Sequence, residues 1–315
     1  MSKLAPRYTA LYNGVWLVAN DLILGQAVGA WMCDGHAQLA SRCAHAVRPL
    51  LQDRVLALLA WLDRWPAGVK LNAQLSRFFC DMLHGLTRLW GDHVLELFLA
   101  HDGARLGRLF FALGMATRFF GLTMLFALLI DMVRLATLHL TLFYRLQRAI
   151  YVFFRTSLHT LFHLFRGKKR NPLRNMRTDA ARYDVEQLLL GTLFFTLLAF
   201  LALTVVVYYA SFVVVRTGVV GVVVALEMAL ALLNHVPLFA LMLRVKDKAR
   251  LPGGVAVHTL DVAPACAAHT LPATYFSLAS TPLTVWTIVH GYCAHLGPVQ
   301  RLPARLLGAL RGRHV

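Results

Sequence analysis

The sequence is poor in acidic residues, and long stretches carry no charge at all. Its 315 residues include 15 Asp and Glu against 32 Lys and Arg, which gives a formal net charge of +17. Only 15% of the residues are charged and 58% are hydrophobic, whereas about 25% are charged in a typical soluble domain. From Leu188 to Val215 no Asp, Glu, Lys or Arg occurs. A helix over that stretch would exceed the ~30 Å hydrocarbon core of a bilayer, so we predict an integral membrane protein.

Motifs for catalysis and metal binding are also missing. The five cysteines form no C-x-x-C pair, and their odd number argues against a disulfide framework or a zinc site. The only glutamates, Glu96, Glu186 and Glu227, lack the partner eight residues away that is common in retaining nucleotide-sugar transferases. There is no Asp-x-Asp motif, no evident strand and no glycine-rich phosphate loop. His159 and His163 have the spacing of two zinc ligands but no third ligand nearby, so we predict no catalytic residue, no metal and no cofactor.

The excess of positive charge fits a membrane protein. Lys and Arg gather in cytosolic loops and are attracted to the anionic cytoplasmic leaflet. A net positive charge could also bind nucleic acid, but the sequence shows no soluble domain that would carry such a binding surface. We therefore predict no nucleic-acid partner. The first apolar stretch, from Leu11 to Cys33, is longer than the ~7–15 residues of a signal-peptide core. We therefore expect an uncleaved membrane segment.

The hydrophobic pattern predicts an all-α, polytopic integral membrane protein with transmembrane, amphipathic and re-entrant helices. We divide the chain into five segments: an N-terminal membrane segment (1–36), an amphipathic helical hairpin (37–104), a membrane span followed by a long basic-striped helix and a cytosolic basic loop (105–182), a transmembrane hairpin (183–250), and a C-terminal membrane-associated region (251–315).

The first segment holds polar residues within its apolar run. Asn13 and Asn20 lie seven residues apart, on one helical face, and Asp21 is adjacent. A carboxylate at the centre of a bilayer costs at least ~2.5 kcal/mol, so we expect Asn20 and Asp21 to contact protein rather than lipid. A re-entrant or interfacial hairpin is the alternative.

The second segment is interrupted by the run WPAGVKLN. Pro66 and Gly68 are expected to end one helix, and Asn72 to cap the next. Trp65 could anchor at the membrane interface and Lys70 could contact a phosphate. The alternative is a helix–turn–helix corner without a ligand.

The third segment contains the most informative helix. After a candidate span at Leu109–Ile130, polar residues from Arg134 to Phe165 recur at steps of three, four and seven and form one narrow stripe. Arg145, Arg148 and Arg155 belong to this stripe, and we expect them to contact lipid headgroups or a partner.

A basic run follows, with Arg166, Lys168, Lys169 and Arg170 at its start. These cations are further candidates for headgroup or partner contacts, each worth roughly 1 kcal/mol near an anionic surface. Alternatively, they only keep the loop in the cytosol.

The fourth segment is predicted to be a hairpin of two spans, Leu188–Val215 and Val219–Leu243, joined by a turn at 216–218. Glu227 and Asn234 lie seven residues apart on the second span and are candidate intramembrane polar contacts. In the fifth segment, prolines interrupt an uncharged stretch, which fits either two crossings or a re-entrant loop.

Five stretches, in order, resemble the PIG-Q family, the subunit of the GPI N-acetylglucosaminyltransferase complex. They are VWLVANDLILG (15–25), WPAGVKLN (65–72), LFYRLQRAIY (142–151), LFRGKKRNPLRN (164–175) and YDVEQLLLGTLFFTLL (183–198). The likeness covers roughly positions 11–245, and we expect the chain to lack the long N-terminal extension of many relatives.

The resemblance implies a multi-pass protein of the endoplasmic reticulum membrane. It implies a non-catalytic scaffold in the complex that transfers N-acetylglucosamine from UDP-GlcNAc to phosphatidylinositol, the first step of GPI-anchor biosynthesis. The implied partners are a PIG-A-like catalytic subunit, PIG-C, PIG-H, and PIG-P- and PIG-Y-like subunits, within a phospholipid membrane. The alternative function is a phosphatidylinositol-binding or lipid-translocating membrane protein.

Overall fold

The computed structural model describes residues 4–64, 66–96, 104–171, 177–180, 182–247, 251–260 and 275–293. These residues are mainly helical, and two helices are long and apolar enough to cross a membrane, which confirms the predicted class of all-α membrane protein. The helices are α1 (Leu4–Asp34), α2 (His36–Arg48), α3 (Arg54–Asp63), α4 (Ala73–Trp90), α6 (Ala104–Phe120), α7 (Leu122–Ala136), α8 (Leu138–Phe165), α9 (Val185–His235), α10 (Leu238–Lys246) and α11 (Val285–Cys293).

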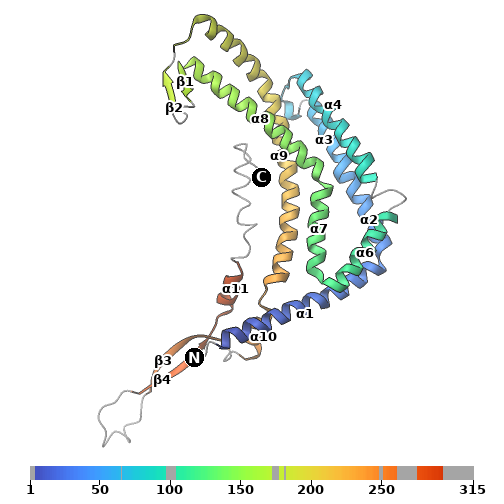
Figure 1. Ribbon diagram of the computed structural model, residues 1–315, viewed down its shortest axis with the longest axis vertical. Coiled ribbons are helices and arrows are strands. Elements are labelled where there is room, and N and C mark those ends of the chain that lie inside the picture. Colours follow the sequence, from blue (N-terminus) through green and yellow to red (C-terminus); the bar gives the residue numbers. More distant parts are fainter. Residues whose placement is uncertain are drawn as a thin grey trace, which may run out of the picture. The chain divides into compact units, whose positions relative to one another are not determined.

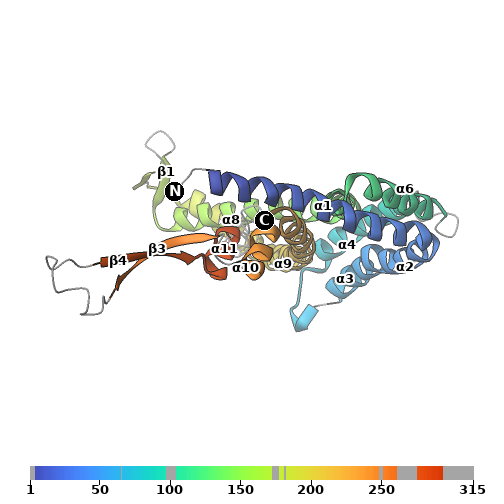
Figure 2. The same ribbon diagram turned by 90° about the horizontal axis from the view of Figure 1, so that it is seen from below.

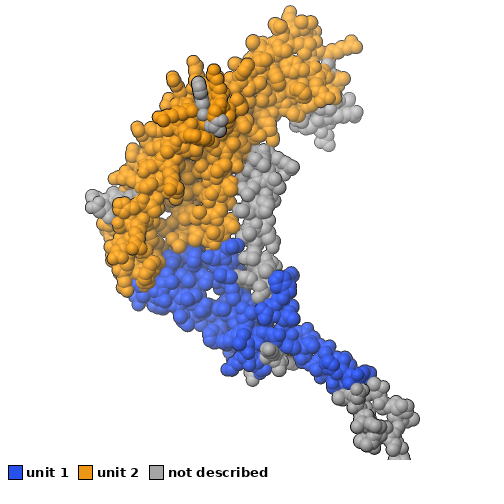
Figure 3. Space-filling model, turned by 180° about the vertical axis from the view of Figure 1, so that it is seen from behind, with its two compact units in different colours: residues 1–30, 114–127, 227–300 blue, residues 31–113, 128–226, 301–315 orange. Residues whose placement is uncertain are grey.

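The chain forms two compact units, coloured separately in Figure 3. Unit 1 contains the described residues of 1–30, 114–127 and 227–300. Unit 2 contains those of 31–113 and 128–226. Each unit therefore combines segments that are distant in the sequence.

The core of unit 2 is made by four helices. Its central side chains are fully or almost fully buried: Leu59 and Leu62 of α3, Phe79 and Leu83 of α4, Phe143 and Tyr144 of α8, and Tyr208 and Phe212 of α9. Buried polar groups are usually hydrogen-bonded, and Ser76 and Tyr208 follow this rule, whereas the side-chain amide of the buried Gln147 has no partner among the described residues. The hydroxyl of Tyr208 lies 2.9 Å from Ser76 Oγ and donates to the Ser76 carbonyl at 3.0 Å.

The corner between α3 and α4 forms where the sequence predicts it. A 3₁₀ turn occupies Pro66–Gly68, and Gly68 has a φ of 76°, which suits glycine. The Oδ1 atom of Asn72 accepts the Leu75 amide at 3.0 Å and caps α4. The amide of Asn72 donates to Thr204 Oγ1 of α9 at 2.9 Å, so this corner also ties α4 to α9.

Replacing Asn72 by Ala is expected to lower the stability of the chain by about 1 kcal/mol, because the cap is lost. The thermal unfolding midpoint of the full chain in mild detergent would then fall by about 2 °C. Asn72→Asp is the control, since it keeps an acceptor oxygen; a midpoint equal to that of Asn72→Ala would contradict a capping role.

Two helices predicted to be continuous are broken in the structure. The span predicted at Leu109–Ile130 is interrupted at Gly121, whose φ of 92° separates α6 from α7. The helix predicted from Arg134 to Phe165 is interrupted at Thr137, where α7 and α8 meet with a bend of 53°. The Thr137 hydroxyl donates to the Val133 carbonyl at 2.7 Å, a back-bond that competes with regular helix geometry.

The prediction of a hairpin in the fourth segment is wrong, because the structure has no turn at 216–218. α9 is one helix of 51 residues that runs through 216–218 without a break. At 1.5 Å per residue it is about 77 Å long, more than twice the ~30 Å hydrocarbon core. Arg-Thr-Gly favours a turn in water, but in an apolar environment a helix satisfies every backbone group internally.

The structure also contains strands that the sequence pattern did not reveal. β1 (Lys168–Asn171) pairs with β2 (Arg177–Ala180), and β3 (Pro252–Leu260) with β4 (Tyr275–Pro282), both antiparallel. The ribbon of β3 and β4 is visible in Figure 2. Val255 and Val257 alternate with smaller or polar residues along β3, the period of a strand, so this part of the fifth segment is a ribbon rather than a helix. Residues 261–274 and 294–315 lie outside the described part.

In unit 2 the C-terminal part of α8 and the N-terminal part of α9 run side by side and are joined through β1 and β2 (Figure 1). The rings of Phe165 and Phe195 pack edge to face at 5.4 Å. A Cβ atom at Gly191 would lie 2.7 Å from Leu164 Cδ2, so glycine allows this close approach.

Candidate functional site

Asp21 of α1 caps another helix within unit 1. Its Oδ1 accepts the Thr123 amide and its Oδ2 accepts the Thr123 hydroxyl, both at 2.8 Å. Thr123 lies in the first turn of α7, directly after the break at Gly121. The unpaired amides at a helix N-terminus favour a negative charge, so the carboxylate stabilises the start of α7.

Asn13 of α1 caps the N-terminus of α10 in the same way. Its Oδ1 accepts the Phe239 amide at 3.1 Å, in the first turn of α10 after Pro237. Asn20 lies half-buried between Asn13 and Asp21 along α1. Two polar residues of the apolar α1, Asp21 and Asn13, therefore cap the N-termini of other helices.

α1 also makes a close glycine contact with α6. Gly25 and Gly29 face the backbone around Gly114 and Thr117, where an added Cβ would come within 2.7 Å and 2.6 Å of carbonyl oxygens. Gln26 adds hydrogen bonds to Arg118, accepting from its Nε at 3.2 Å and donating to its carbonyl at 2.8 Å. Small residues at such a crossing allow two membrane helices to approach closely.

The arginine stripe on α8 is largely open to the surroundings. Arg145 and Arg155 are exposed and Arg148 is half-buried. Thr141 of the same stripe accepts a hydrogen bond from Arg216 Nη1 at 2.9 Å. Arg216 was not among the predicted site residues, because the sequence around it was interpreted as a turn. The available signal was a single cation between two long apolar stretches.

The basic residues that follow α8 form part of a hairpin. Arg166 ends α8, and Lys168, Lys169 and Arg170 lie in β1, opposite Ala180, Asp179 and Thr178. The side chains of Arg166 and Lys168 are exposed. Those of Lys169 and Arg170, and residues 172–176 of the same run, lie outside the described part.

The other predicted site residues lie on other elements than α8. Lys70 is exposed in the α3–α4 corner of unit 2. Glu227 is half-buried and Asn234 is exposed on the part of α9 that belongs to unit 1. Trp65 lies outside the described residues.

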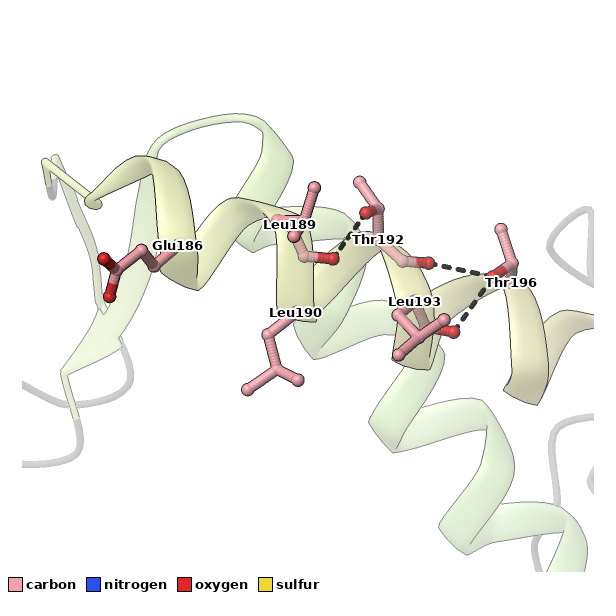
Figure 4. A pocket seen from close by; sticks show the side chains of 6 residues that line it. All are labelled: Glu186, Leu189, Leu190, Thr192, Leu193 and Thr196. Atoms are coloured by element: carbon pink, nitrogen blue, oxygen red, sulfur yellow. Dashed lines mark hydrogen bonds between the residues drawn. The ribbon is translucent and has the colours of Figure 1, made fainter.

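A recess of about 640 Å³ lies along the first turns of α9 (Figure 4). Its threonine hydroxyls bond to their own helix: Thr192 donates to the Leu189 carbonyl and Thr196 to those of Thr192 and Leu193. Among the residues that the structure describes, Glu186 is the only ionisable one that lines it. The recess is therefore an apolar surface and offers no pair of groups for acid–base chemistry.

Unit 2 has a second recess, an apolar groove of about 500 Å³ between α2–α3, the α7–α8 bend and the middle of α9. Among the described residues, no three His, Cys, Asp or Glu side chains are placed to hold a metal ion. The rings of His159 and His163 pack at 4.3 Å on α8.

Comparison with known proteins gives one family. A family model described as "N-acetylglucosaminyl transferase component (Gpi1)" matches residues 1–253. The chain is 34% identical over 262 residues to the N-acetylglucosaminyl-phosphatidylinositol biosynthetic protein gpi1 of Schizosaccharomyces pombe, covering 82% of this chain and 38% of that protein. It is 34% identical over 256 residues to the phosphatidylinositol N-acetylglucosaminyltransferase subunit GPI1 of Saccharomyces cerevisiae, covering 81% and 42%.

A human protein has the same percentage identity to this chain. Subunit Q of the Homo sapiens phosphatidylinositol N-acetylglucosaminyltransferase is 34% identical over 248 residues, covering 76% of this chain and 31% of that protein. The chain thus spans about two fifths of the length of the two yeast relatives. No solved structure matches.

Proposed function

The chain belongs to the Gpi1 family of N-acetylglucosaminyl transferase components, and on that premise we propose that it is a subunit of the complex that transfers N-acetylglucosamine to phosphatidylinositol. Family membership is the observation that carries this proposal. The matched relatives are named as subunits or biosynthetic proteins of this reaction. The long apolar helices α1 and α9 support a location in a membrane, which we propose is that of the endoplasmic reticulum, crossed more than once.

Within that complex we propose the role of a scaffold, with the glycosyl transfer performed by a separate PIG-A-like subunit. Two features support this role. Polar groups of the helices, such as Asp21 and Asn13 of the apolar α1 and Ser76 of the amphipathic α4, hold helices to one another. Arg145 and Arg155, which are exposed, and the half-buried Arg148 form an arginine edge along α8 in unit 2. An acidic surface of a partner subunit could bind to this arginine edge.

The arginine edge gives a test by charge reversal. Changing Arg145, Arg148 and Arg155 to Glu is expected to reduce recovery of the PIG-A-like subunit by about tenfold or more, because a like-charge contact costs several kcal/mol and 1.4 kcal/mol is tenfold. Recovery is measured by affinity purification from mild detergent and mass spectrometry. Membrane insertion, followed by fractionation, is expected to be unchanged.

The matched control changes Arg77, Arg88 and Arg108 to Glu, since these are exposed arginines of unit 2 on helices other than α8. The control chain is expected to recover its partners normally. Normal recovery with the α8 variant would exclude the arginine edge as the binding surface. Failure of the unchanged chain to co-purify with any PIG-A-like subunit would refute the proposed function itself.

A further inference from the structure

Arg216 stands out in unit 2 by what surrounds it. It is the only Lys or Arg in the 51 residues of α9, and it is half-buried. One nitrogen, Nη1, donates to Thr141 Oγ1, while the buried Nε has no acceptor among the described residues. A guanidinium has five N–H donors and no acceptor, so this single contact leaves most of its hydrogen-bonding capacity for another group.

The charges around Arg216 are of the same sign. The guanidiniums of Arg145 and Arg134 lie close enough to repel it, and the neutral Tyr144 hydroxyl is also nearby. Arg134 lies 3.7 Å from Asp131, but within the described part of the chain neither Arg216 nor Arg145 forms an ion pair. Arg145 and Arg134 are exposed and Arg216 is half-buried, so these like charges repel one another, and a bound anion would offset that repulsion.

An apolar groove ends beside these arginines. It is the groove of about 500 Å³ defined above, and aliphatic side chains dominate its lining, among them Leu50, Val55, Leu58, Leu140, Val219 and Val222. Leu140 and Val215 line the groove and directly precede Thr141 and Arg216 in the chain. Arg216 also lies one turn from Val219 on α9, so the arginines lie at the rim of an elongated apolar surface.

We propose that this site binds one anionic phospholipid, with its phosphodiester held by Arg216 and Arg145 and an acyl chain in the groove. Arginine forms paired hydrogen bonds with phosphate oxygens, which a zwitterionic ammonium headgroup would weaken by neutralising the charge. The charge-free stretch Leu188–Val215 ends immediately before Arg216. From an apolar position on α9, the long side chain of Arg216 can extend its guanidinium towards lipid phosphates.

This binding is a property of the isolated chain and does not depend on the complex. The full chain is purified alone in mild detergent, and dissociation constants are measured for three probes: dioctanoyl phosphatidylinositol, dioctanoyl phosphatidylcholine and inositol 1-phosphate. We expect the anionic lipid to bind at least about fivefold more tightly than the zwitterionic one, and the chain-free headgroup to bind weakly. Equal affinity for the two lipids would refute the site. Tight binding of inositol 1-phosphate would show that the site takes a soluble phosphate ester, and it would refute the proposed lipid ligand.

Substitutions of single residues test whether the lipid binds at Arg216, Arg145 and the groove. Arg216→Gln and Arg145→Gln are each expected to weaken binding of the anionic lipid about tenfold, the effect of losing a charged hydrogen bond. Val222→Trp fills the groove from an exposed position and is expected to weaken binding of both lipids. Arg108→Gln is the matched control, because it removes the same charge from an exposed position of unit 2.

The unfolding midpoint of each variant is measured beside its affinity. If Arg216→Gln does not fold, Arg145→Gln and Val222→Trp decide the question. An equal effect of Arg108→Gln and Arg145→Gln would show a general charge effect and would overturn the proposal.

Discussion

The double change Gly25→Ala and Gly29→Ala is expected to destabilise the chain strongly. At Gly25 the new Cβ would lie 2.7 Å from the Gly121 Cα, and at Gly29 it would lie 2.6 Å from the Gly114 carbonyl oxygen. Both neighbours are backbone atoms, so α1 and α6 must separate. Overpacking of this kind costs about 1–3 kcal/mol per site, and we expect the thermal unfolding midpoint in mild detergent to fall by at least about 5 °C.

The same helix provides the control. No atom lies within 4 Å of a Cβ placed on Gly14. Gly14→Ala is therefore expected to keep or raise the midpoint, because alanine is favoured over glycine in a helix by about 1 kcal/mol. If all three alanines had the same effect, the close crossing of α1 and α6 would not exist in the folded chain.

The change Asp21→Ala is the second large effect that we expect. It leaves the Thr123 amide and hydroxyl without their acceptors at the start of α7. Loss of a helix cap costs about 1 kcal/mol in water, and an unsatisfied backbone group in hydrocarbon costs several kcal/mol. The full chain should therefore be extracted as aggregated material, which size-exclusion chromatography in mild detergent would detect as a loss of the monodisperse peak.

Asp21→Asn separates capping from charge. The amide oxygen of Asn can still accept the Thr123 amide, so this variant should elute nearly as the unchanged chain does. Equal loss of the peak for Asn and Ala would mean that the negative charge itself is required. An unchanged peak for Ala would show that Asp21 does not stabilise the start of α7.

Features encoded by neighbouring residues could be predicted from the sequence. Pro66 and Gly68 end a helix because proline lacks the amide hydrogen and Gly68 adopts a positive φ. The cap formed by Asn72 follows from its position before a helical run, since the side chain reaches only three residues ahead.

Features that depend on distant contacts could not be predicted in the same way. The break at Gly121 coincides with a carboxylate from α1, about a hundred residues away in the chain, and a Cβ at this glycine would collide with Asp21. The polar pattern of α1 indicated that Asp21 contacts protein, but it contained no information on which helix would receive it. Likewise, Arg216 can be interpreted as part of a turn until Thr141 is known to lie beside it.

The continuity of α9 shows how the surroundings alter a local preference. Gly218 and Gly221 weaken a helix in water, yet both lie within α9 and have no atom within 4 Å of an added Cβ. An apolar environment offers the backbone no other hydrogen-bond partner, so helix formation there tolerates residues that would end a helix elsewhere.

The two caps supplied by α1 impose a delay during biosynthesis. Thr123 follows Asp21 by 102 residues, and Phe239 follows Asn13 by 226. At about 5–20 residues per second, translation takes roughly 5–20 s to supply the first of these partners and roughly 11–45 s to supply the second. During that interval α1 has left the ribosome with a carboxylate and an amide that lack their native contacts. Its entry into the lipid must therefore wait, or a membrane insertase must shield it, until the later helices have been made.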